Sequence, residues 1–586
     1  MHALTHHHQE RLQELKQGII MLTVSITPNA GIRKIKQLFD EGEQVWYDVY
    51  EAPSIEGAVI QATVPRQEQS VAAVARYLLA KGAQRPSTTE RQGIIASAIA
   101  ADAPIVRRAA RNGWRDATTF VTHRSVVSGR DDAEAILPPS GAFAGSTGHM
   151  QDRGDLDGWR ALIKIARFST AMMIALVTIF AAPLLKIARR PNFGLVLYGP
   201  SRSGKSTAQL VGASALGYGQ EEDLPSLNAT ASGLLAVAVA FNDHAIPINE
   251  VGTARGGKGN VHEVVRETTY ALMNGQDIIR HPNWAGGDGG AAATFQVLPL
   301  MSSEHSPDAW AARKGETRDE GETARLIGVP VLFNGSQTIF DLAPETLTGA
   351  DLAAWEKTQF QLLREGLPNF RGLAFSTYTE WLARQHKAVE EVVRILVANF
   401  EVAVARPTMS PVERDIVAKF GVLYAGGLLA IAAGVLPLDM KRLGAALKRA
   451  CLAALAEIPN PQAELKADLK ALKVKLNGAN VLDTETCTRK QLRLMHNADG
   501  FRQPKNEGLE CVVRSEVFTK WFRSDVRKQR VLEWLDAEGF LDHGRDRTTG
   551  RSIQWAQRQV TWPDTSRKRS ISVYLPGGFA DLERSF

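Results

Sequence analysis

The chain has 586 residues, of which 44% are hydrophobic and 23% are charged. This balance is typical of soluble globular proteins, and the length predicts about three to four domains. The three cysteines, Cys451, Cys487 and Cys511, are too few and too scattered for a disulfide framework or a zinc site. We therefore expect a cytoplasmic protein without a secretory signal, and we expect residues 1–21 to form a disordered leader.

The charge is unevenly distributed along the chain. Residues 487–586 carry 19 Lys and Arg against 13 Asp and Glu, so this segment holds the whole +6 surplus of the protein. The remaining residues are about neutral. A basic terminal domain is the electrostatic footprint of nucleic-acid binding, although an ordinary solvated face can have the same composition.

Residues 22–150 alternate strand-like and helix-like segments, and they predict an α/β accessory domain without a catalytic constellation. Val45 to Tyr50 alternates as a strand does, and Ser70 to Ala83 has helical spacing. Thr88 to Arg111 is typical of one helix or of paired helices. The Gly-, Ser- and Asp-rich segment 140–154 predicts a loop at the domain boundary.

The segment from Phe168 to Leu185 is nearly apolar and long enough to imitate a transmembrane helix, which needs about 20 apolar residues. It also contains hydroxyl-bearing residues and Pro183, and it directly precedes a strand-like run. We therefore predict a buried core helix packed on a sheet, and no membrane partner. A membrane span is the alternative.

The stretch from Gly194 to Thr207, GLVLYGPSRSGKST, contains the phosphate-binding pattern G-x-x-x-x-G-K-[ST] between a strand-like and a helix-like run. In this pattern backbone N–H groups and the helix N-terminus surround the β-phosphate. Lys205 contacts the β- and γ-phosphates of ATP, and the Ser206 hydroxyl binds Mg²⁺. The predicted nucleotide contacts, in an ATPase core over residues 155–345, are Gly199, Pro200, Ser201, Arg202, Ser203, Gly204, Lys205, Ser206 and Thr207.

A second apolar strand, His244 to Ile248, ends in Asn249-Glu250 and is expected beside the strand of the phosphate-binding loop. At such a strand end an Asp holds Mg²⁺ through water, and a Glu polarises the attacking water. Glu250 is the predicted catalytic residue. Asn249 can bind a metal-bound water but brings no charge, so weaker Mg²⁺ binding is predicted. A strand that ends in a plain polar turn is the alternative.

Further elements of the core follow this strand. The Gly-rich basic segment 252–260 is either a mobile DNA-contacting loop or an ordinary connection, and two strands around the Gly-rich segment 284–290 suggest a β-hairpin insert. A third strand, Thr294 to Met301, ends in Ser302-Ser303-Glu304, where Ser303 is a candidate sensor of the γ-phosphate. Arg325 precedes another apolar run.

Residues 346–458 predict an all-helical domain, and its position after an ATPase core resembles the lid of AAA+ proteins. An arginine of such a lid can reach the γ-phosphate, and Arg414 is the candidate. An ion pair with Glu413 or Asp415 is the alternative. Residues 459–486 predict a charged linker helix.

Residues 487–586 resemble a winged helix, with two helices over 514–523 and 525–538 followed by two β-runs. The runs 559–562 and 571–575 are expected to flank a basic tip, Arg567-Lys568-Arg569. We predict that this tip contacts DNA phosphates together with the cations of the second helix. A protein-interaction role is the alternative. The cations of the helix are Arg523, Arg527, Lys528 and Arg530.

Several motifs, in the same order along the chain, resemble one family over roughly residues 100–440. The family is the domain-of-unknown-function ATPase family of phage, plasmid and genomic-island proteins, whose members include minichromosome-maintenance-like AAA+ replicative helicases. The motifs are Gly113-Trp114, Gly158-Trp159-Arg160 through Ala182-Pro183-Leu184-Leu185, GPSRSGKST, Asn228-Ala229-Thr230, Asn274-Gly275, Ser303-Glu304 and the run from Phe420 to Gly434.

This resemblance implies ATP hydrolysis coupled to DNA unwinding by a hexameric ring, with ATP and Mg²⁺ bound and with a primase or initiator as a possible partner. By position it implies roles for Lys205, Ser206, Glu250 and Ser303, and for Arg325 as an arginine near the end of the core. Two function classes remain open. One is a DNA-translocating ATPase that acts on single-stranded and duplex DNA, and the other is a DNA-binding regulator or scaffold with slow ATP turnover. Asn249 is the residue that divides them.

Overall fold

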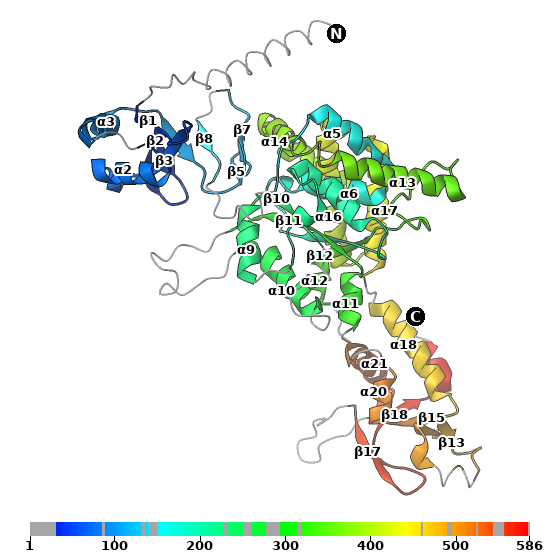
Figure 1. Cartoon of the computed structure of the whole chain (residues 1–586). Helices are drawn as coiled ribbons and strands as arrows, with labels where there is room; N and C mark the ends of the chain where they lie inside the picture. Colours follow the sequence, from blue (N-terminus) through cyan, green and yellow to red (C-terminus); the bar gives the residue numbers. More distant parts are fainter. Residues whose placement is uncertain are drawn as a thin grey trace.

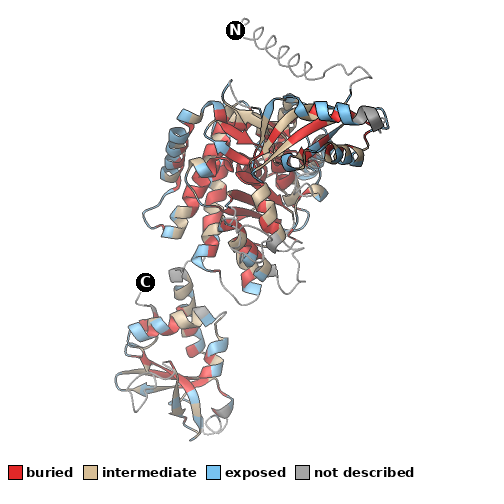
Figure 2. Ribbon diagram, turned by 90° about the vertical axis from the view of Figure 1, so that its left-hand side faces the viewer, coloured by how far each residue is buried: buried red, intermediate tan, exposed pale blue. Residues whose placement is uncertain are grey.

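The computed structural model describes residues 31–583, apart from residues 85–87, 132–134, 140–148, 228–230, 250–260, 277–293, 314–317, 459–460, 489–490, 492–494, 523–524 and 543–555. The described residues form a mixed α/β fold with several sheets and many helices (Figure 1). Buried residues concentrate around the central sheet and its helices, and a smaller buried group lies in the C-terminal unit (Figure 2). The predicted leader lies outside the described residues.

The N-terminal sheet has the order β3-β2-β1-β4-β8 and is covered by two helices, with a small core of its own. Its first three strands are antiparallel neighbours, whereas β4 pairs parallel with β1. The predicted helix over 88–111 is correct only in its first part, because residues 105–108 are a strand. The elements are β1 (Arg33–Asp40), β2 (Val45–Pro53), β3 (Val59–Pro65), α2 (Val71–Ala80), α3 (Thr88–Ala100), β4 (Ile105–Arg108) and β8 (Ile136–Leu137).

A second small sheet, β5-β6-β7, belongs to the main core and not to the N-terminal one. Trp114 and Phe120 of this sheet lie in the main hydrophobic cluster. The Trp114 indole donates to the carbonyl of Pro183 at 2.8 Å, and its backbone N–H donates to the Asp243 carboxylate at 2.9 Å. The main core therefore begins well before residue 150. The strands are β5 (Gly113–Asp116), β6 (Thr119–Val121) and β7 (Val126–Ser128).

The central sheet has the order β10-β11-β9-β12, and its neighbouring strands are all parallel. The prediction that β10 lies beside β9 is wrong, because β11 pairs with both. Buried parallel strands all read as continuous apolar runs, so their sequences do not encode their order. The strands are β9 (Gly194–Tyr198), β10 (His244–Ile248), β11 (Val297–Ser303) and β12 (Leu326–Pro330).

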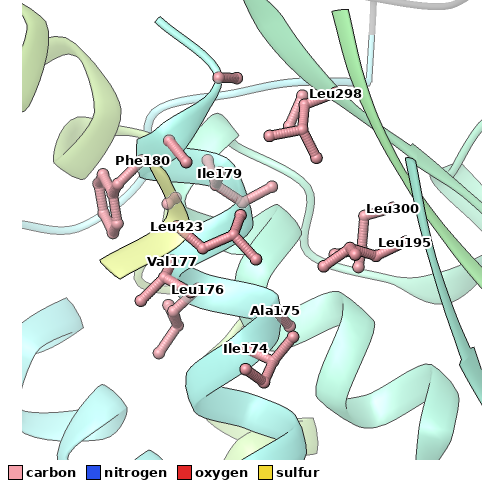
Figure 3. Close-up of a cluster of buried hydrophobic side chains, with 14 of the residues drawn as sticks. Ile174, Ala175, Leu176, Val177, Ile179, Phe180, Leu195, Leu298, Leu300 and Leu423 are labelled. Atoms are coloured by element: carbon pink, nitrogen blue, oxygen red, sulfur yellow. The ribbon is translucent and has the colours of Figure 1, made fainter. Parts of the chain in front are cut away.

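One apolar helix, α6 (Thr170–Ala181), lies at the centre of the main core, and every one of its residues is buried. Side chains of α6 meet the sheet on one side and Leu423 on the other (Figure 3). The neighbouring backbones approach closely through Gly212 and Gly426, where an added Cβ would lie 2.7 Å from backbone atoms of α6. The prediction of a buried core helix is confirmed.

The helical region α13–α17 shares its hydrophobic core with the sheet, and α16 packs against α6. Among the described helices, α16 alone has the length and composition that a membrane span requires, and 72% of its apolar window is buried within the protein. The helices are α13 (Gly349–Gly366), α14 (Leu373–Arg384), α15 (His386–Val404), α16 (Pro411–Ala432) and α17 (Met440–Ala456).

The remaining helices between residues 156 and 325 surround the central sheet, and with it and α13–α17 they form the main body of the protein. Helix α9 is rich in alanine, and α10 leads from β10 toward β11. They are α5 (Leu156–Ile163), α7 (Leu184–Ile187), α8 (Lys205–Ala213), α9 (Ala231–Ala240), α10 (Val261–Met273), α11 (Pro307–Arg313) and α12 (Glu320–Arg325).

In its described residues, the C-terminal unit combines a sheet, β13-β14-β15-β18-β16 with β17 beside β18, with the helices α18, α20 and α21. The predicted linker helix is wrong as a separate segment, because Leu469, Leu472 and Leu476 of α18 are buried in this unit's core. The elements are α18 (Pro461–Leu476), β13 (Val481–Asp483), β14 (Gly500–Lys505), β15 (Gly508–Arg514), α20 (Ser515–Lys520), α21 (Asp525–Ala537), β16 (Leu541–Asp542), β17 (Arg558–Thr561) and β18 (Arg567–Leu575).

The basic residues predicted at a hairpin tip lie instead at the start of a strand. Arg567, Lys568 and Arg569 begin β18 and pair with Thr561, Val560 and Gln559 of β17. The turn itself is Trp562 to Ser566, closed by a hydrogen bond of 2.8 Å from the Trp562 N–H to the Ser566 carbonyl. The Asp564 carboxylate also accepts from the Ser566 N–H, so local hydrogen bonding sets the turn position.

Candidate nucleotide site

The phosphate-binding pattern forms the loop between β9 and α8. Strand β9 ends at Tyr198 and α8 begins at Lys205, so the pattern lies between a strand and a helix N-terminus. Arg202 and Gly204 have φ values of 63° and 99°, and this left-handed backbone turns the loop into the helix. An added Cβ at Gly204 would lie 3.0 Å from Ile339 and Phe360, so the position also requires close approach.

Two polar groups in this loop are suited to a phosphate ligand. The Lys205 ammonium donates to the Pro200 carbonyl of its own loop at 3.1 Å, in an exposed hydrogen bond. The Ser203 side chain is buried, and its hydroxyl has no partner among the described residues. A cation held over the loop and a spare hydroxyl within it fit the phosphates of a nucleotide.

The carboxyl ends of the parallel strands meet at this loop. The Gly199 N–H donates to the Ser303 carbonyl of β11 at 3.2 Å. The Gln209 side chain, fully buried on α8, donates to the carbonyls of Ile248 and Leu300 at 2.8 and 2.7 Å. The helix that follows the loop is therefore hydrogen-bonded to β10 and β11, which fixes the direction of its N-terminus.

Ser303 lies beside the loop, and its hydroxyl oxygen accepts two hydrogen bonds. It accepts from the Trp310 indole at 3.1 Å and from the His305 N–H at 3.2 Å. Burial lowers the pKa of the His305 imidazole. The positive charges of Arg313 and Lys205 lower it further. Glu304 is exposed at the same strand end.

Helix α13 forms the opposite wall of a cavity of about 710 Å³ over the loop. Its lining includes Lys357 and Arg364 of α13 and Arg202, Lys205 and Ser206 of the loop. The sequence did not predict these two cations of α13 as site residues, because no motif surrounds them. Their spacing of seven residues, two helical turns, places them on one face, which is informative only once α13 is known to cover the loop.

Asn249 directly follows β10, and its side chain is hydrogen-bonded to neighbouring segments. Its amide donates to the Glu221 carbonyl at 3.3 Å, and its amide oxygen accepts from the Ser302 hydroxyl at 3.4 Å. The described lining of the cavity includes Glu221 but not Asn249. Glu250, the loop 252–260, the segment 284–290 and Asn228-Ala229-Thr230 lie outside the described residues.

The two arginines predicted to reach the γ-phosphate do not line this cavity. Arg325 ends α12 just before Leu326, which pairs with Gly194 at the start of β9, so it lies at the opposite edge of the sheet from the loop. Its guanidinium lies over the Tyr270 ring, 5.4 Å from the centroid.

Arg414 is exposed near the start of α16, the helix in which Lys419 donates to the Ala324 carbonyl of α12 at 2.7 Å. Its predicted ion pairs are also not formed among the described side chains. Glu413 instead caps α16 by accepting from the Ser410 N–H, and Asp415 binds Lys419 at 2.6 Å.

The described helix cations that were predicted to contact DNA form ion pairs with carboxylates of the C-terminal unit. Arg527 binds Asp468 of α18 through two hydrogen bonds of 2.7 and 2.8 Å, and Arg530 binds Glu464 at 2.9 Å. Lys528 binds Asp525 of its own helix. Arg527 and Arg530 are therefore ion-paired within the unit, DNA contact through this face of α21 stays a prediction, and Arg523 lies outside the described residues.

This chain resembles one protein family over part of its length and one solved structure over most of it. A family model described as a domain of unknown function, DUF927, matches residues 57–282, which includes the phosphate-binding loop but ends before β11. No curated protein sequence matches the chain. The solved structure titled "SCCmec type IV Cch - active helicase" is similar with a TM-score of 0.57 and 13% identity, over 93% of each chain. The chain therefore shares the overall fold of a structure described as a helicase.

Two solved structures of the C-terminal region of NrS-1 also match, at lower similarity. One has a TM-score of 0.25 and 9% identity over 69% of this chain and 88% of that chain. The other has a TM-score of 0.29 and 9% identity over 91% of this chain and 95% of that chain. At these scores neither structure supports an argument about the fold of this chain.

Proposed function

We propose that the protein is an ATP-dependent DNA helicase or translocase, with a P-loop core of the AAA+ type and a helical lid, that serves the replication of a mobile genetic element. The observation that carries this proposal is the loop from Gly199 to Thr207, which turns from a parallel strand into a helix N-terminus with Lys205 over it. This arrangement surrounds phosphate with backbone N–H groups and one positive charge.

ATP is the proposed substrate, and several residues around the loop would each contact its phosphates. Lys205 would bind the β- and γ-phosphates. Arg364 and Lys357 would approach the same phosphates from α13 on the other side of the cavity. Bound Mg²⁺ would neutralise phosphate charge, and the residues that would hold it are Ser206 directly and Asn249 through water.

The proposal that DNA is the second ligand is supported by the basic C-terminal segment and by the fold shared with a structure titled as a helicase. A winged-helix-like domain would hold duplex DNA while the core moves along a strand. We further propose a homo-hexameric ring in which Arg325 or Arg414, at the edge remote from the loop, contacts the γ-phosphate bound by the next copy. A primase or initiator would then be the replication partner.

A second function, a DNA-binding regulator with slow turnover, is favoured by one observation. The side chain of Asn249 is neutral and already bonded to Glu221 and Ser302, so it brings no charge to a metal. The two functions share nucleotide binding and differ in turnover.

Unwinding of a forked DNA duplex tests the proposal. We expect strand separation that requires ATP and Mg²⁺ and that Lys205→Ala abolishes, and we expect sedimentation of the protein with ATP and DNA to show a ring. ATP binding without DNA-stimulated turnover or unwinding would favour the regulator. A protein that stays monomeric with ATP and DNA at micromolar concentration would contradict the ring.

A further inference from the structure

We infer that the C-terminal unit binds the phosphate backbone of duplex DNA through one face of its β17–β18 hairpin, and not through α21. We call this surface the ribbon face, and it consists of Gln559, Thr561, Arg567 and Arg569. The inference rests on the proposal that the protein works on DNA, but it is independent of ATP turnover.

The cations of α21 are already paired within the unit. Arg527 and Arg530 form ion pairs with Asp468 and Glu464 of α18, and the side chain of Arg527 is only 15% exposed. Helix α18 cannot move aside at low cost, because its leucines are part of the hydrophobic core of this unit. Phosphates would have to replace carboxylates that the fold itself holds in place.

The ribbon face, in contrast, carries two arginines without an ion pair among the described residues. Apart from Lys520 on α20, Arg567 and Arg569 are the arginine and lysine side chains without an ion pair in the described part of residues 487–586. Both are exposed. Lys568 between them points to the other face, where its ammonium lies 4.1 Å from the centroid of the Trp562 ring and 3.9 Å from Asp564.

The pairing of the hairpin places these two arginines on one face. Arg569 pairs with Gln559 and Arg567 with Thr561, so all four side chains project from the same side. Residues two apart on a strand lie about 6.7 Å from each other, which lets both guanidinium groups contact one phosphate backbone. The opposite side carries Val560 and Trp562, which belong to a small hydrophobic core. The hairpin is therefore fixed on one side and polar on the other.

The position of the hairpin leaves this face accessible within its unit. In Figure 1 the hairpin, labelled at β17, lies on the far side of the C-terminal unit from α18 and α21. Arginine, glutamine and threonine are donors that bind phosphate oxygens, and such contacts hold DNA without reading its sequence. The partner is thus duplex DNA held by its backbone.

Salt dependence of binding to a short duplex, measured without nucleotide on the full chain, tests the inference. The variant Arg567→Gln/Arg569→Gln removes two phosphate contacts, so its logarithmic salt slope should be smaller by about 1.8. Between about 50 and about 200 mM salt, the wild type should therefore lose roughly tenfold more affinity than this variant. Nucleotide binding at Lys205 should not change.

A charge swap across the α18–α21 contact is the matched control. The variant Arg527→Glu/Asp468→Arg reverses the charge on α21 while it keeps an ion pair with α18, and its salt slope should equal that of the wild type. The inference is overturned if the ribbon variant keeps the wild-type slope, if the swap flattens it, or if the wild type does not bind duplex DNA at low salt. None of these results depends on ATP turnover, so a failure here and a failure of the proposed ATPase are distinguishable.

Discussion

Arg527 of α21 is held by Asp468 of α18 in a two-point ion pair, with N–O distances of 2.7 and 2.8 Å. The side chains of this pair are 15% and 13% exposed, so it is shielded from water and salt more than a surface pair. The contact joins the predicted linker helix to the predicted DNA-binding helix, and it therefore makes both of them part of one folded unit.

The first prediction concerns the stability of that unit. A double-mutant cycle with Arg527→Ala and Asp468→Ala should give a coupling energy of about 1–2 kcal/mol, between the values for exposed and buried pairs. Either single variant should lower the unfolding midpoint of the C-terminal unit. The same cycle on Arg394 and Glu391, an exposed pair within α15, should give a much smaller coupling energy, because solvent and salt screen the pair. Equal coupling at the two sites would contradict the structural role of the contact.

The second prediction concerns the wall of the nucleotide cavity. Arg364→Ala should weaken ATP binding about tenfold, because a charge-assisted hydrogen bond to phosphate would be lost. Titration of ATP into the purified variant measures the effect. Arg394→Ala, which removes an equivalent charge from α15 away from the cavity, serves as the control. If the two variants bind ATP equally well, α13 does not contact the nucleotide.

How much the sequence could predict differs between the loop and its surroundings. The strand, the loop and the helix from Gly194 to Val211 follow from local sequence, because a short apolar run and two glycines determine them. The all-apolar α6 could also be predicted as buried, since a helix without a polar face must be surrounded by protein.

The rest depends on contacts between distant segments. That β11 lies between β9 and β10, that α13 covers the loop, and that α18 neutralises α21 are all properties of packing, which no single segment encodes. For the same reason the sequence did not indicate Arg364, which lines the cavity.

The third prediction concerns Asn249. Asn249→Asp should raise ATP turnover several-fold at limiting Mg²⁺, because it adds a negative charge that can hold a metal-bound water. The new carboxylate cannot donate to the Glu221 carbonyl as the amide does, so the variant should also be slightly less stable. Glu250→Gln should bind ATP and hydrolyse little. If Glu250→Gln hydrolyses like the wild type, the residue that polarises water lies elsewhere.

The fourth prediction concerns pH and a buried histidine. His244 is fully enclosed between Phe120 and Phe375, and burial lowers the pKa of its imidazole from 6.5 to about 4. Between these values the unfolded chain binds a proton that the folded chain does not, so stability is complete above about pH 6.5 and falls as the pH decreases toward 4. The loss from this residue approaches about 3 kcal/mol.

Thermal unfolding of the main body as a function of pH measures this effect. His244→Asn, whose amide can replace the hydrogen bond to the Asn242 carbonyl, should reduce the decrease in stability between pH 6.5 and pH 5. An unchanged pH dependence in the variant would show that other groups, such as the neighbouring His123, cause the loss.

The central claim is that the loop carrying Lys205 binds and hydrolyses ATP for work on DNA. Its most direct test is the steady-state ATPase rate of the full chain with Mg²⁺, measured with and without single-stranded DNA, for the wild type and for Lys205→Ala. We predict a wild-type rate that single-stranded DNA increases, and a variant that neither binds ATP nor hydrolyses it at either condition. Equal nucleotide affinity and equal turnover in the two proteins would contradict the assignment of the loop.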